Sequence, residues 1–246
     1  MSSGDPEVDT SAPAHGPDAA TSETNDGAQV VPDAARTLFG ARVDRAAAYV
    51  DFLAGPGLER GLMGPREAPR LWDRHVLNSA VLAELIPQGA LVADVGSGAG
   101  LPGVPLAIAR PDLEVVLIEP MLRRTEFLAE VVDALELDRV TIRRARAEDL
   151  DVTDRFDVVT ARAVAPLTRL ATWTLRLLRP GGRLLALKGR TVSEELAESA
   201  ASLARMGAVS WTVEDVGHEF VDPPARVAVV ERGRRRHEAK RRQRRK

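Results

Sequence analysis

The residues best suited to chemistry lie in a short stretch near the middle of the chain. An apolar run, Leu91–Val95, is followed by glycines at alternate positions, Gly96, Gly98 and Gly100. This pattern predicts a buried strand that enters a tight turn. Because glycine has no Cβ, the backbone of such a turn can approach a ligand closely. Glu119 ends the next apolar run, and a carboxylate there can accept hydrogen bonds from ribose hydroxyls. The stretch therefore predicts a pocket for a nucleotide-type cofactor.

The glycine stretch is compatible with more than one ligand. Its second half, Gly98–Gly103, matches G-x-G-x-x-G, the pattern of dinucleotide-binding proteins. Its first half, Asp94–Gly100, resembles the first motif of class I S-adenosylmethionine-dependent methyltransferases. A glycine-rich turn that binds nothing is a third interpretation. Other residues must distinguish the three.

The elements that would position this pocket alternate between strand and helix patterns. Strands are predicted at 91–95, 114–119, 139–143, 156–161 and 183–188, with helices at 102–110, 121–136, 166–179 and 193–206. Two further strands, at 208–216 and 225–231, follow the last helix. Such alternation predicts an α/β domain, here residues 90–231, in which helices cover both faces of a parallel sheet.

The remaining residues predict a helical extension and two charged tails. Residues 34–89 form the extension, with helices at 34–54 and 70–86. Residues 1–33 contain seven acidic side chains, no Lys or Arg and few large apolar residues, which predicts a disordered acidic tail. Residues 232–246 contain ten Lys or Arg and one acid, which predicts a disordered basic tail able to bind phosphates.

Composition excludes several classes of protein. Cysteine is absent, which excludes disulfides and those pyrimidine C5 methyltransferases that need a thiolate nucleophile. No apolar run reaches the ~18 residues of a membrane-spanning helix, and no signal peptide is evident, so we expect a cytoplasmic protein without a membrane partner. His and acidic residues show no metal-ligand spacing, so we expect no metal.

Several segments together resemble one family of RNA-modifying enzymes. They are Arg74-His75-x-x-Asn78-Ser79, Asp94–Gly103, Arg146-Ala147-Glu148, Thr160-Ala161-Arg162-Ala163 and Ala186-Leu187-Lys188-Gly189. In this order and at these intervals the chain resembles the ribosomal RNA small subunit methyltransferase G family, once called glucose-inhibited division protein B. The resemblance implies a class I S-adenosylmethionine-dependent methyltransferase fold. This is a Rossmann-like, doubly wound and mostly parallel sheet that ends in an antiparallel hairpin. Asn78 departs from the family pattern, because many members have Asp there.

The resemblance implies methylation of guanine N7 in 16S rRNA, with S-adenosyl-L-methionine as cofactor. The cofactor-binding positions that it implies are Gly96, Leu101, Ala147, Glu148 and Arg162, which Gly98, Gly100 and Glu119 join from the loop pattern. Ala147 and Glu148 follow the third strand, where an acceptor can take the adenine amino protons. Arg162 ends the fourth strand, at the edge where open α/β sheets bind ligands. A loop acid at Glu148 and a surface ion pair at Arg162 remain alternatives.

The implied reaction requires no general base, because guanine N7 carries a lone pair and no proton. We therefore expect residues that align the reactants. Arg162, Lys188 and either Arg123 or Arg124 are candidates to hold a phosphate or guanine O6, and the alternative for the last two is a solvated helix turn. We expect His75 to be a hydrogen-bonded packing histidine.

The expected partner is 16S rRNA or the small ribosomal subunit, bound by a monomer. One competing hypothesis is an NAD(P)-dependent oxidoreductase, but the only tyrosine is Tyr49 and no Tyr-x-x-x-Lys pair is present. Another is a non-enzymatic RNA-binding protein that uses the basic tail, against which the glycine loop and Glu119 argue.

Overall fold

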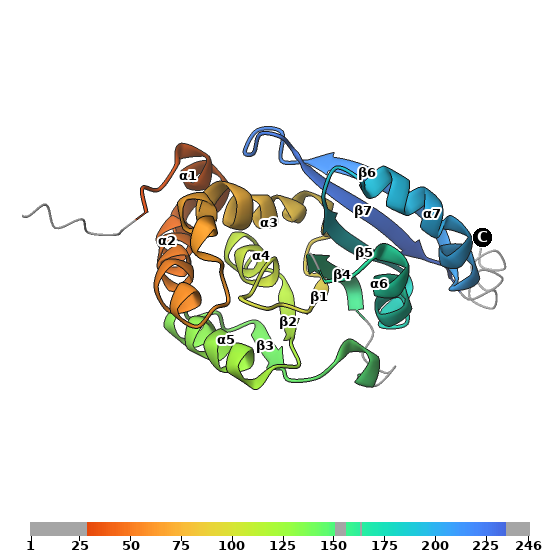
Figure 1. Ribbon diagram of the computed structural model, residues 1–246, viewed down its shortest axis with the longest axis horizontal. Helices are drawn as coiled ribbons and strands as arrows, with labels where there is room; N and C mark the ends of the chain where they lie inside the picture. Colours follow the sequence, from red (N-terminus) through yellow and green to blue (C-terminus); the bar gives the residue numbers. More distant parts are fainter. Residues whose placement is uncertain (1–28, 151–155, 163, 235–246) are drawn as a thin grey trace, which may run out of the picture.

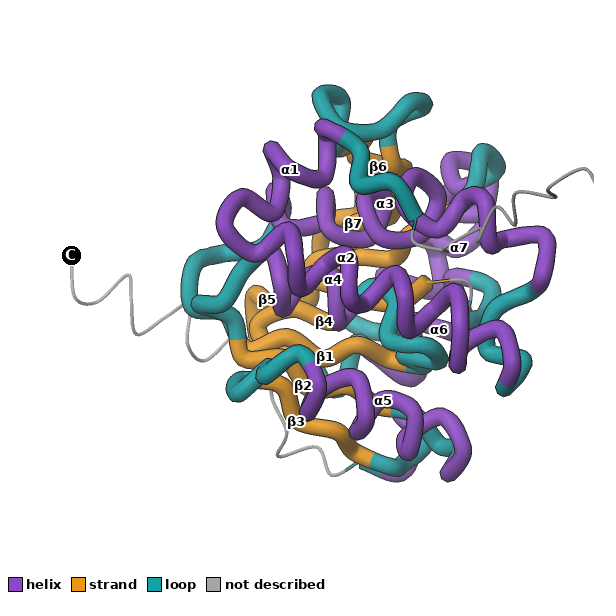
Figure 2. The backbone as a smooth tube through the Cα atoms, turned by 90° about the vertical axis from the view of Figure 1, so that its left-hand side faces the viewer, coloured by secondary structure: helices purple, strands orange, loops and turns teal. Residues whose placement is uncertain are grey.

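A seven-stranded sheet forms the centre of the part of the chain that the structure describes (Figure 1). The computed structural model describes residues 29–150, 156–162 and 164–234. The strands are β1 (Leu91–Val95), β2 (Glu114–Ile118), β3 (Val140–Arg143), β4 (Phe156–Arg162), β5 (Leu178–Lys188), β6 (Ala208–Val216) and β7 (Ala225–Arg232). Their order is β3-β2-β1-β4-β5-β7-β6, and Figure 2 shows the first five stacked side by side. These five are parallel, whereas β7 is antiparallel to both β5 and β6. The predicted α/β sheet with a terminal antiparallel hairpin is confirmed.

Helices and short helical turns precede the sheet and connect its strands. Before β1 they are α1 (Asp33–Phe39), η1 (Gly40–Arg42), α2 (Val43–Phe52), η2 (Leu53–Gly57), η3 (Pro65–Arg70), η4 (Leu71–Leu77), α3 (Asn78–Ala80) and η5 (Val81–Leu85). After β1 they are α4 (Gly103–Ala109), α5 (Leu122–Ala134), η6 (Ala147–Asp149), α6 (Leu167–Thr174) and α7 (Val192–Arg205).

The two faces of the sheet support two separate hydrophobic cores. Successive side chains of a strand point to opposite faces, so neighbours such as Val158 and Val159 of β4 belong to different cores. The first core packs against α1, α2, α4, α5 and the turns before β1, and the second packs against α6 and α7. Runs of consecutive apolar residues in β1, β2 and β4 therefore fit strands that are buried on both sides.

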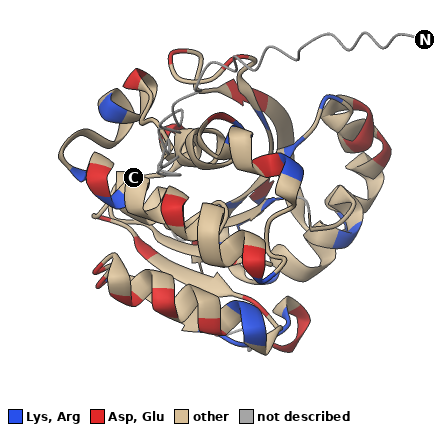
Figure 3. Cartoon of the chain, turned by 60° about the vertical axis from the view of Figure 1, so that its left-hand side comes forward, with Lys and Arg blue, Asp and Glu red and all other residues tan. Residues whose placement is uncertain are grey.

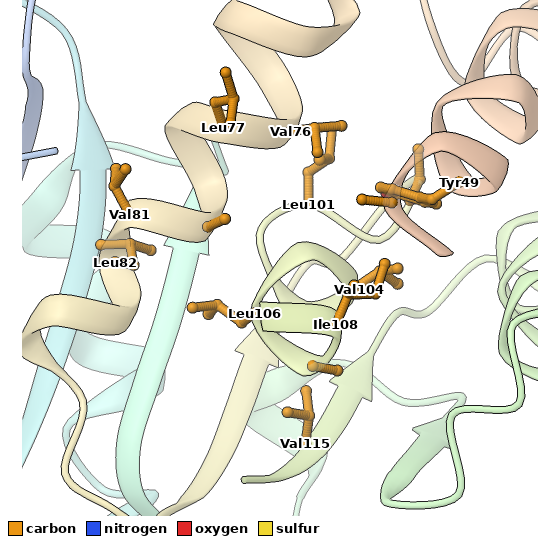
Figure 4. Close-up of a cluster of buried hydrophobic side chains, with 14 of the residues drawn as sticks. Tyr49, Val76, Leu77, Val81, Leu82, Leu101, Val104, Leu106, Ile108 and Val115 are labelled. Atoms are coloured by element: carbon orange, nitrogen blue, oxygen red, sulfur yellow. The ribbon is translucent and has the colours of Figure 1, made fainter. Parts of the chain in front are cut away.

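The helices before β1 are part of the first core. Figure 4 shows Leu82 facing Leu106 of α4, with Val81 and Leu77 on the same helical segment, and Tyr49 near Val104. Each of these side chains is at most 1% exposed. Burial of one such aliphatic side chain contributes about 1.5–3 kcal/mol, so the extension and the sheet stabilise each other.

The helix predicted at 166–179 is wrong at its C-terminal end. α6 ends at Thr174, and β5 begins at Leu178, which pairs with Phe156 of β4. The first residues of β5 include Gly182, whose absent Cβ would lie 2.9 Å from the carbonyl oxygen of Asp157. Close approach of two strands at a glycine explains why a Pro-Gly-Gly segment lies within a strand here.

The long helices predicted at 34–54 and 70–86 are interrupted. The first breaks at Gly40, where φ is +54°, and continues as α2. The second consists of the turns from η3 to η5, with only the short α3 in α-helical form. Hydrophobic periodicity located both segments but did not reveal these changes of helix type.

Most of the two predicted tails lies outside the described residues. Of the acidic tail, the structure describes residues 29–33, and of the basic tail residues 232–234. Figure 3 shows acidic and basic residues interspersed along the outer helices. Exposed pairs among them, such as Arg60 with Glu130 at 2.7 Å, contribute about 0–1 kcal/mol each. Within the described ranges, no helix combines the length and apolar character needed to span a membrane.

Candidate functional site

A cavity of about 620 Å³ lies at the carboxyl ends of β1, β2 and β4. We call it the strand-end cavity, because the last residues of these strands, Val95, Ile118 and Arg162, line it. Its volume is within the range of small-molecule sites, and this edge is where open α/β sheets bind ligands. The predicted site residues that line it are Gly96, Gly98, Leu101, Glu119, Arg124, Ala147, Glu148 and Arg162.

The glycine loop forms one wall of the strand-end cavity. The N–H of Gly96 donates to the carbonyl of Ile118 at 2.9 Å, which fixes the loop to the end of β2. At Gly98 φ is +58°, a conformation that residues with a side chain rarely adopt. The nearest atom to a Cβ at Gly98 would be the Gly96 carbonyl oxygen at 3.8 Å, so none of the described residues packs closely against this position. The loop therefore offers bare backbone to a ligand.

Glu119 holds the glycine loop through its carboxylate. Oε2 accepts a hydrogen bond from the Gly98 N–H at 3.0 Å, and Oε1 accepts one from the Met121 N–H at 3.0 Å. Arg124 Nη1 lies 3.5 Å from Oε2. The side chain is only 1% exposed, but it lines the cavity and each oxygen has a further lone pair. A carboxylate so held can accept hydrogen bonds from vicinal hydroxyls.

The Asp94 carboxylate links the end of β1 to two neighbouring segments through hydrogen bonds. Its Oδ2 accepts a hydrogen bond from the Gly103 N–H at 3.0 Å, and its Oδ1 accepts one from the Thr160 hydroxyl at 3.1 Å. Burial raises the pKa of Asp94 to about 6, although these hydrogen bonds act in the opposite direction. Asp94 thus joins β1 to the start of α4 and to β4.

Ala147 and Glu148, in η6, also line the cavity. Ala147 is buried, and its carbonyl accepts a hydrogen bond from Arg176 Nη2 at 2.6 Å. Glu148 is exposed and free to meet a donor from the cavity. The cavity lining thus combines the apolar side chains of Ala147 and Leu101 with the acceptor of Glu148.

Arg162 reaches the cavity beside a histidine and a glutamate. Its Nη2 lies 2.6 Å from His75 Nδ1, and its Nη1 donates to the His75 carbonyl and to the Ser79 hydroxyl at 3.3 Å each. His75 Nε2 lies 2.7 Å from Glu67 Oε2. All three side chains line the cavity. His75 is buried and hydrogen-bonded, as expected, but it also faces the site.

Burial and neighbouring charged groups act on the charge state of His75. Burial lowers its pKa most, followed by the nearby charge of Arg162, whereas the Glu67 carboxylate raises it. The net effect is a pKa below the ordinary value, so His75 is neutral at physiological pH. The hydrogen bond with His75 lowers the pKa of Glu67, which is therefore ionised.

Three of the predicted site residues lie away from the strand-end cavity. A Cβ at Gly100 would meet Val104 at 2.6 Å, so this glycine allows α4 and the loop to pack. Arg123 is exposed on the first turn of α5. Lys188 Nζ donates to the Ala165 carbonyl at 2.8 Å and lies 2.9 Å from Glu195.

Lys188 instead lines a second depression, of about 460 Å³, which we call the basic groove. Its charged and polar lining residues are Arg70, Asp73, Arg74, Asn78, Lys188, Arg190, Asp222 and Arg226. Five of these are cationic and two are acidic. Arg74 of the groove precedes His75 of the strand-end cavity, and Lys188 is the last residue of β5. The groove therefore lies next to the strand-end cavity along the same sheet edge. Among the described residues, no group of three His, Asp or Glu could hold a metal ion.

Sequence reasoning missed two residues of the site. Tyr49 of α2 is fully buried and donates to the Ala99 carbonyl in the glycine loop at 2.8 Å. Glu67 contacts His75 and lies 3.6 Å from Arg74. The Arg74-His75 motif pointed to the segment that contains His75, but nothing in the sequence indicated which acidic residue would contact His75.

Comparison with known proteins identifies the family. The pattern of the rRNA small subunit methyltransferase G family matches residues 42–221. Ribosomal RNA small subunit methyltransferase G of Streptomyces avermitilis is 56% identical over 82% of this chain and 85% of its own length. The protein of the same name from Mycolicibacterium gilvum is 54% identical over 80% and 88%.

Solved structures support the fold. A SAM-dependent O-methyltransferase from Thermotoga maritima has a TM-score of 0.52 at 18% identity, over 65% of this chain and 66% of that one. M. jannaschii TYW2, solved with AdoMet, has a TM-score of 0.51 at 18% identity, over 65% and 76%. At such identities the likeness concerns the fold alone. The family match and the close relatives lead to one conclusion: the chain belongs to the rRNA small subunit methyltransferase G family.

Proposed function

We propose that this protein transfers a methyl group from S-adenosyl-L-methionine to N7 of a guanine in 16S rRNA. The strand-end cavity carries the proposal, because it brings Gly98, Glu119, Glu148 and Arg162 together in a member of an rRNA methyltransferase family. The cofactor supplies an electrophilic methyl group on a sulfonium centre. Neither an oxidoreductase nor a non-enzymatic RNA-binding protein finds support in the family match.

Each part of the cavity suits one part of this cofactor. The bare backbone at Gly98, together with Gly96, whose Cβ position is covered by Val164, would contact its methionine portion. The Glu119 carboxylate would accept from its ribose hydroxyls. Ala147 and Glu148 would hold the adenine, with Leu101 packed beside them. The buried Glu119 carboxylate and the exposed Glu148 carboxylate would then serve the ribose and the adenine of one nucleoside.

The protein's contribution to the reaction would be alignment. Guanine N7 has a lone pair and no proton to lose, so the site needs to orient the base and exclude water. Fixing two reactants in a reactive geometry can lower a barrier by ~7–11 kcal/mol. Arg162 is a charged donor that lines the cavity at the end of β4, and an arginine suits a carbonyl oxygen such as O6. Donation to O6 leaves the adjacent N7 free.

The basic groove would receive the RNA backbone next to the target base. Arg70 and Arg190 are exposed, and neither side chain has a hydrogen-bond or ion-pair partner among the described residues. Such cations can bind phosphates without first breaking an internal contact. In this arrangement Lys188 holds the loop after β4 through Ala165, while Arg70 and Arg190 contact RNA.

The same proposal covers how the protein works in the cell. Because its substrate would be 16S rRNA or the small ribosomal subunit, we place it in the cytoplasm. We also propose that it acts as a monomer and without a metal. We further propose that residues 34–89 serve as an extension of the 90–231 catalytic domain.

Methyl transfer to 16S rRNA tests the proposal directly. Purified protein would be incubated with labelled S-adenosylmethionine and small subunits or 16S rRNA from cells that lack the gene. We expect one methyl group per RNA, located at a guanine by mass spectrometry and cleaved as 7-methylguanosine by borohydride and aniline. A methyl group on another base atom or on ribose would contradict the N7 assignment. Absence of transfer to either substrate would contradict the function.

A further inference from the structure

The contact between Arg162 and His75 determines where the proton of the imidazole lies. A guanidinium has only N–H donors, so His75 Nδ1, 2.6 Å from Arg162 Nη2, must accept. The proton of a neutral ring is then on Nε2, which donates to Glu67 Oε2 at 2.7 Å. Glu67, His75 and Arg162 form a directed chain from η3 through η4 to the end of β4.

In this hydrogen-bond chain, the positive charge of Arg162 is not neutralised and some of its N–H donors are unused. Its three partners, His75 Nδ1, the His75 carbonyl and the Ser79 hydroxyl, are all neutral. Within the described part of the protein, no partner is found for the Nε–H or the second Nη2–H. An arginine paired directly with a carboxylate would have its charge largely satisfied by that partner. Here the carboxylate of Glu67 lies one residue further away.

We propose that Glu67 and His75 are positioning residues that direct Arg162 toward an oxygen acceptor in the strand-end cavity, and that His75 does so only as a neutral imidazole. This inference rests on the proposed function. The acceptor is either O6 of the guanine or the carboxylate of the cofactor's methionine portion, since both present an oxygen to a guanidinium. Protonation of Nδ1 removes the acceptor and places a second cation beside Arg162.

The charged groups around His75 set the pH at which its Nδ1 becomes protonated. Glu67 faces it from η3, Arg162 from β4, and Arg74 precedes it in η4. Because burial and the two arginines outweigh Glu67, the pKa of His75 lies below its ordinary value. Methylation should therefore be constant near neutral pH and decline on the acid side. Asp94, with a pKa of about 6, titrates in the same range, so a variant must separate the two.

Substitution of His75 by asparagine makes that separation. His75→Asn provides an Oδ1 acceptor near the position of Nδ1 but does not titrate. His75→Ala provides no acceptor. We expect His75→Ala to lower kcat/KM by ~10- to 100-fold, since a displacement of about 1 Å near a reacting centre can cost about 100-fold. His75→Asn should recover most of this loss and should lose the acid decline. Glu67→Gln, which can still accept from Nε2, should lower activity less than His75→Ala.

Binding measurements identify the oxygen acceptor. If Arg162 holds guanine O6, His75→Ala leaves the affinity for S-adenosylhomocysteine unchanged and lowers kcat or raises the KM for RNA. If it holds the cofactor carboxylate, the affinity for S-adenosylmethionine falls by a similar factor. His218→Asn, at an exposed histidine, is the matched control and should keep the acid decline.

The proposed positioning role is overturned if His75→Ala is as active as the wild type, or if His75→Asn retains the same decline in activity at acid pH. Imidazole nitrogen NMR of the wild-type protein gives a test that needs no activity. An unprotonated Nδ1 and a protonated Nε2 at neutral pH support the chain, and the opposite tautomer overturns it. Wild-type protein that fails to methylate RNA at every pH contradicts the proposed function instead, while the NMR result still decides the tautomer.

Discussion

The two sides of the strand-end cavity are held by different kinds of contact. On the glycine-loop side, the Glu119 carboxylate binds backbone N–H groups, including that of Gly98, 21 residues earlier. On the other side, Arg162 binds His75, 87 residues earlier, and the link to Glu67 is made by side chains. Backbone donors do not titrate, whereas an imidazole does. We therefore expect the loop side to contribute to cofactor affinity through contacts that do not titrate, and the arginine side to make methyl transfer depend on pH.

The largest effect should come from Gly98→Val. The substitution places a branched side chain at φ +58° on a wall that faces the cofactor. We expect the affinity for S-adenosylhomocysteine to fall by about 100-fold or more, equivalent to about 2.7 kcal/mol, while circular dichroism stays like that of the wild type. Calorimetry measures the affinity.

Gly89→Val is the matched control for this change. Gly89 also has a positive φ, +65°, but has no atom near its Cβ position and does not line the cavity. Gly89→Val should impose a similar backbone strain but leave the affinity for S-adenosylhomocysteine unchanged. Unchanged affinity in Gly98→Val would remove the loop from the cofactor site.

The two sides also differ in how far sequence could predict them. Gly98 and Glu119 follow consecutive strands, and parallel strands bring their carboxyl ends to one edge, so local patterns sufficed. The partners of Arg162 and the contact of Tyr49 with Ala99 depend on how the segment before β1 packs on the sheet. No local periodicity encodes that packing. Lys188 was recognised from its motif, but its position at the basic groove follows from strand order.

Asp94 should make the loop side sensitive to pH in stability. Its folded-state pKa, about 6, is above its ordinary value of 3.8, so the folded protein binds more protons between these values. Stability from this group is therefore present below about pH 4 and lost as pH rises through 6. Two pKa units correspond to ~3 kcal/mol as an order of magnitude. Urea unfolding of wild type and Asp94→Asn at pH 4.5 and 7 measures it. An equal pH dependence in both proteins would contradict the assignment.

Glu119→Ala should weaken cofactor binding by a similar or smaller amount. Removal of a charged acceptor costs roughly 1.5–3 kcal/mol, or about 10- to 150-fold in affinity. Glu114→Ala is the matched control, because Glu114 begins β2, the strand that Glu119 follows, is 58% exposed in its side chain and pairs with Arg139. It should bind normally. If Glu119→Ala also binds normally and only unfolds at a lower temperature, Glu119 supports the loop without contacting the cofactor.

The smallest effects should separate the basic groove from the cavity. Arg70→Ala and Arg190→Ala should each lower RNA affinity by a modest factor and leave S-adenosylhomocysteine affinity unchanged. If each arginine contacts one phosphate, the slope of log affinity against log salt should fall by ~0.7 to 0.9 per variant. Arg36→Ala, at an exposed arginine of α1 outside both depressions, should leave the slope unchanged. The basic tail is the competing source of cations, and removal of residues 235–246 tests it. Because single-turnover methylation at saturating RNA depends on alignment in the cavity, it should be nearly constant across all these variants. If only the truncation changes the slope, the phosphate contacts belong to the basic tail, and the groove plays no part in RNA binding.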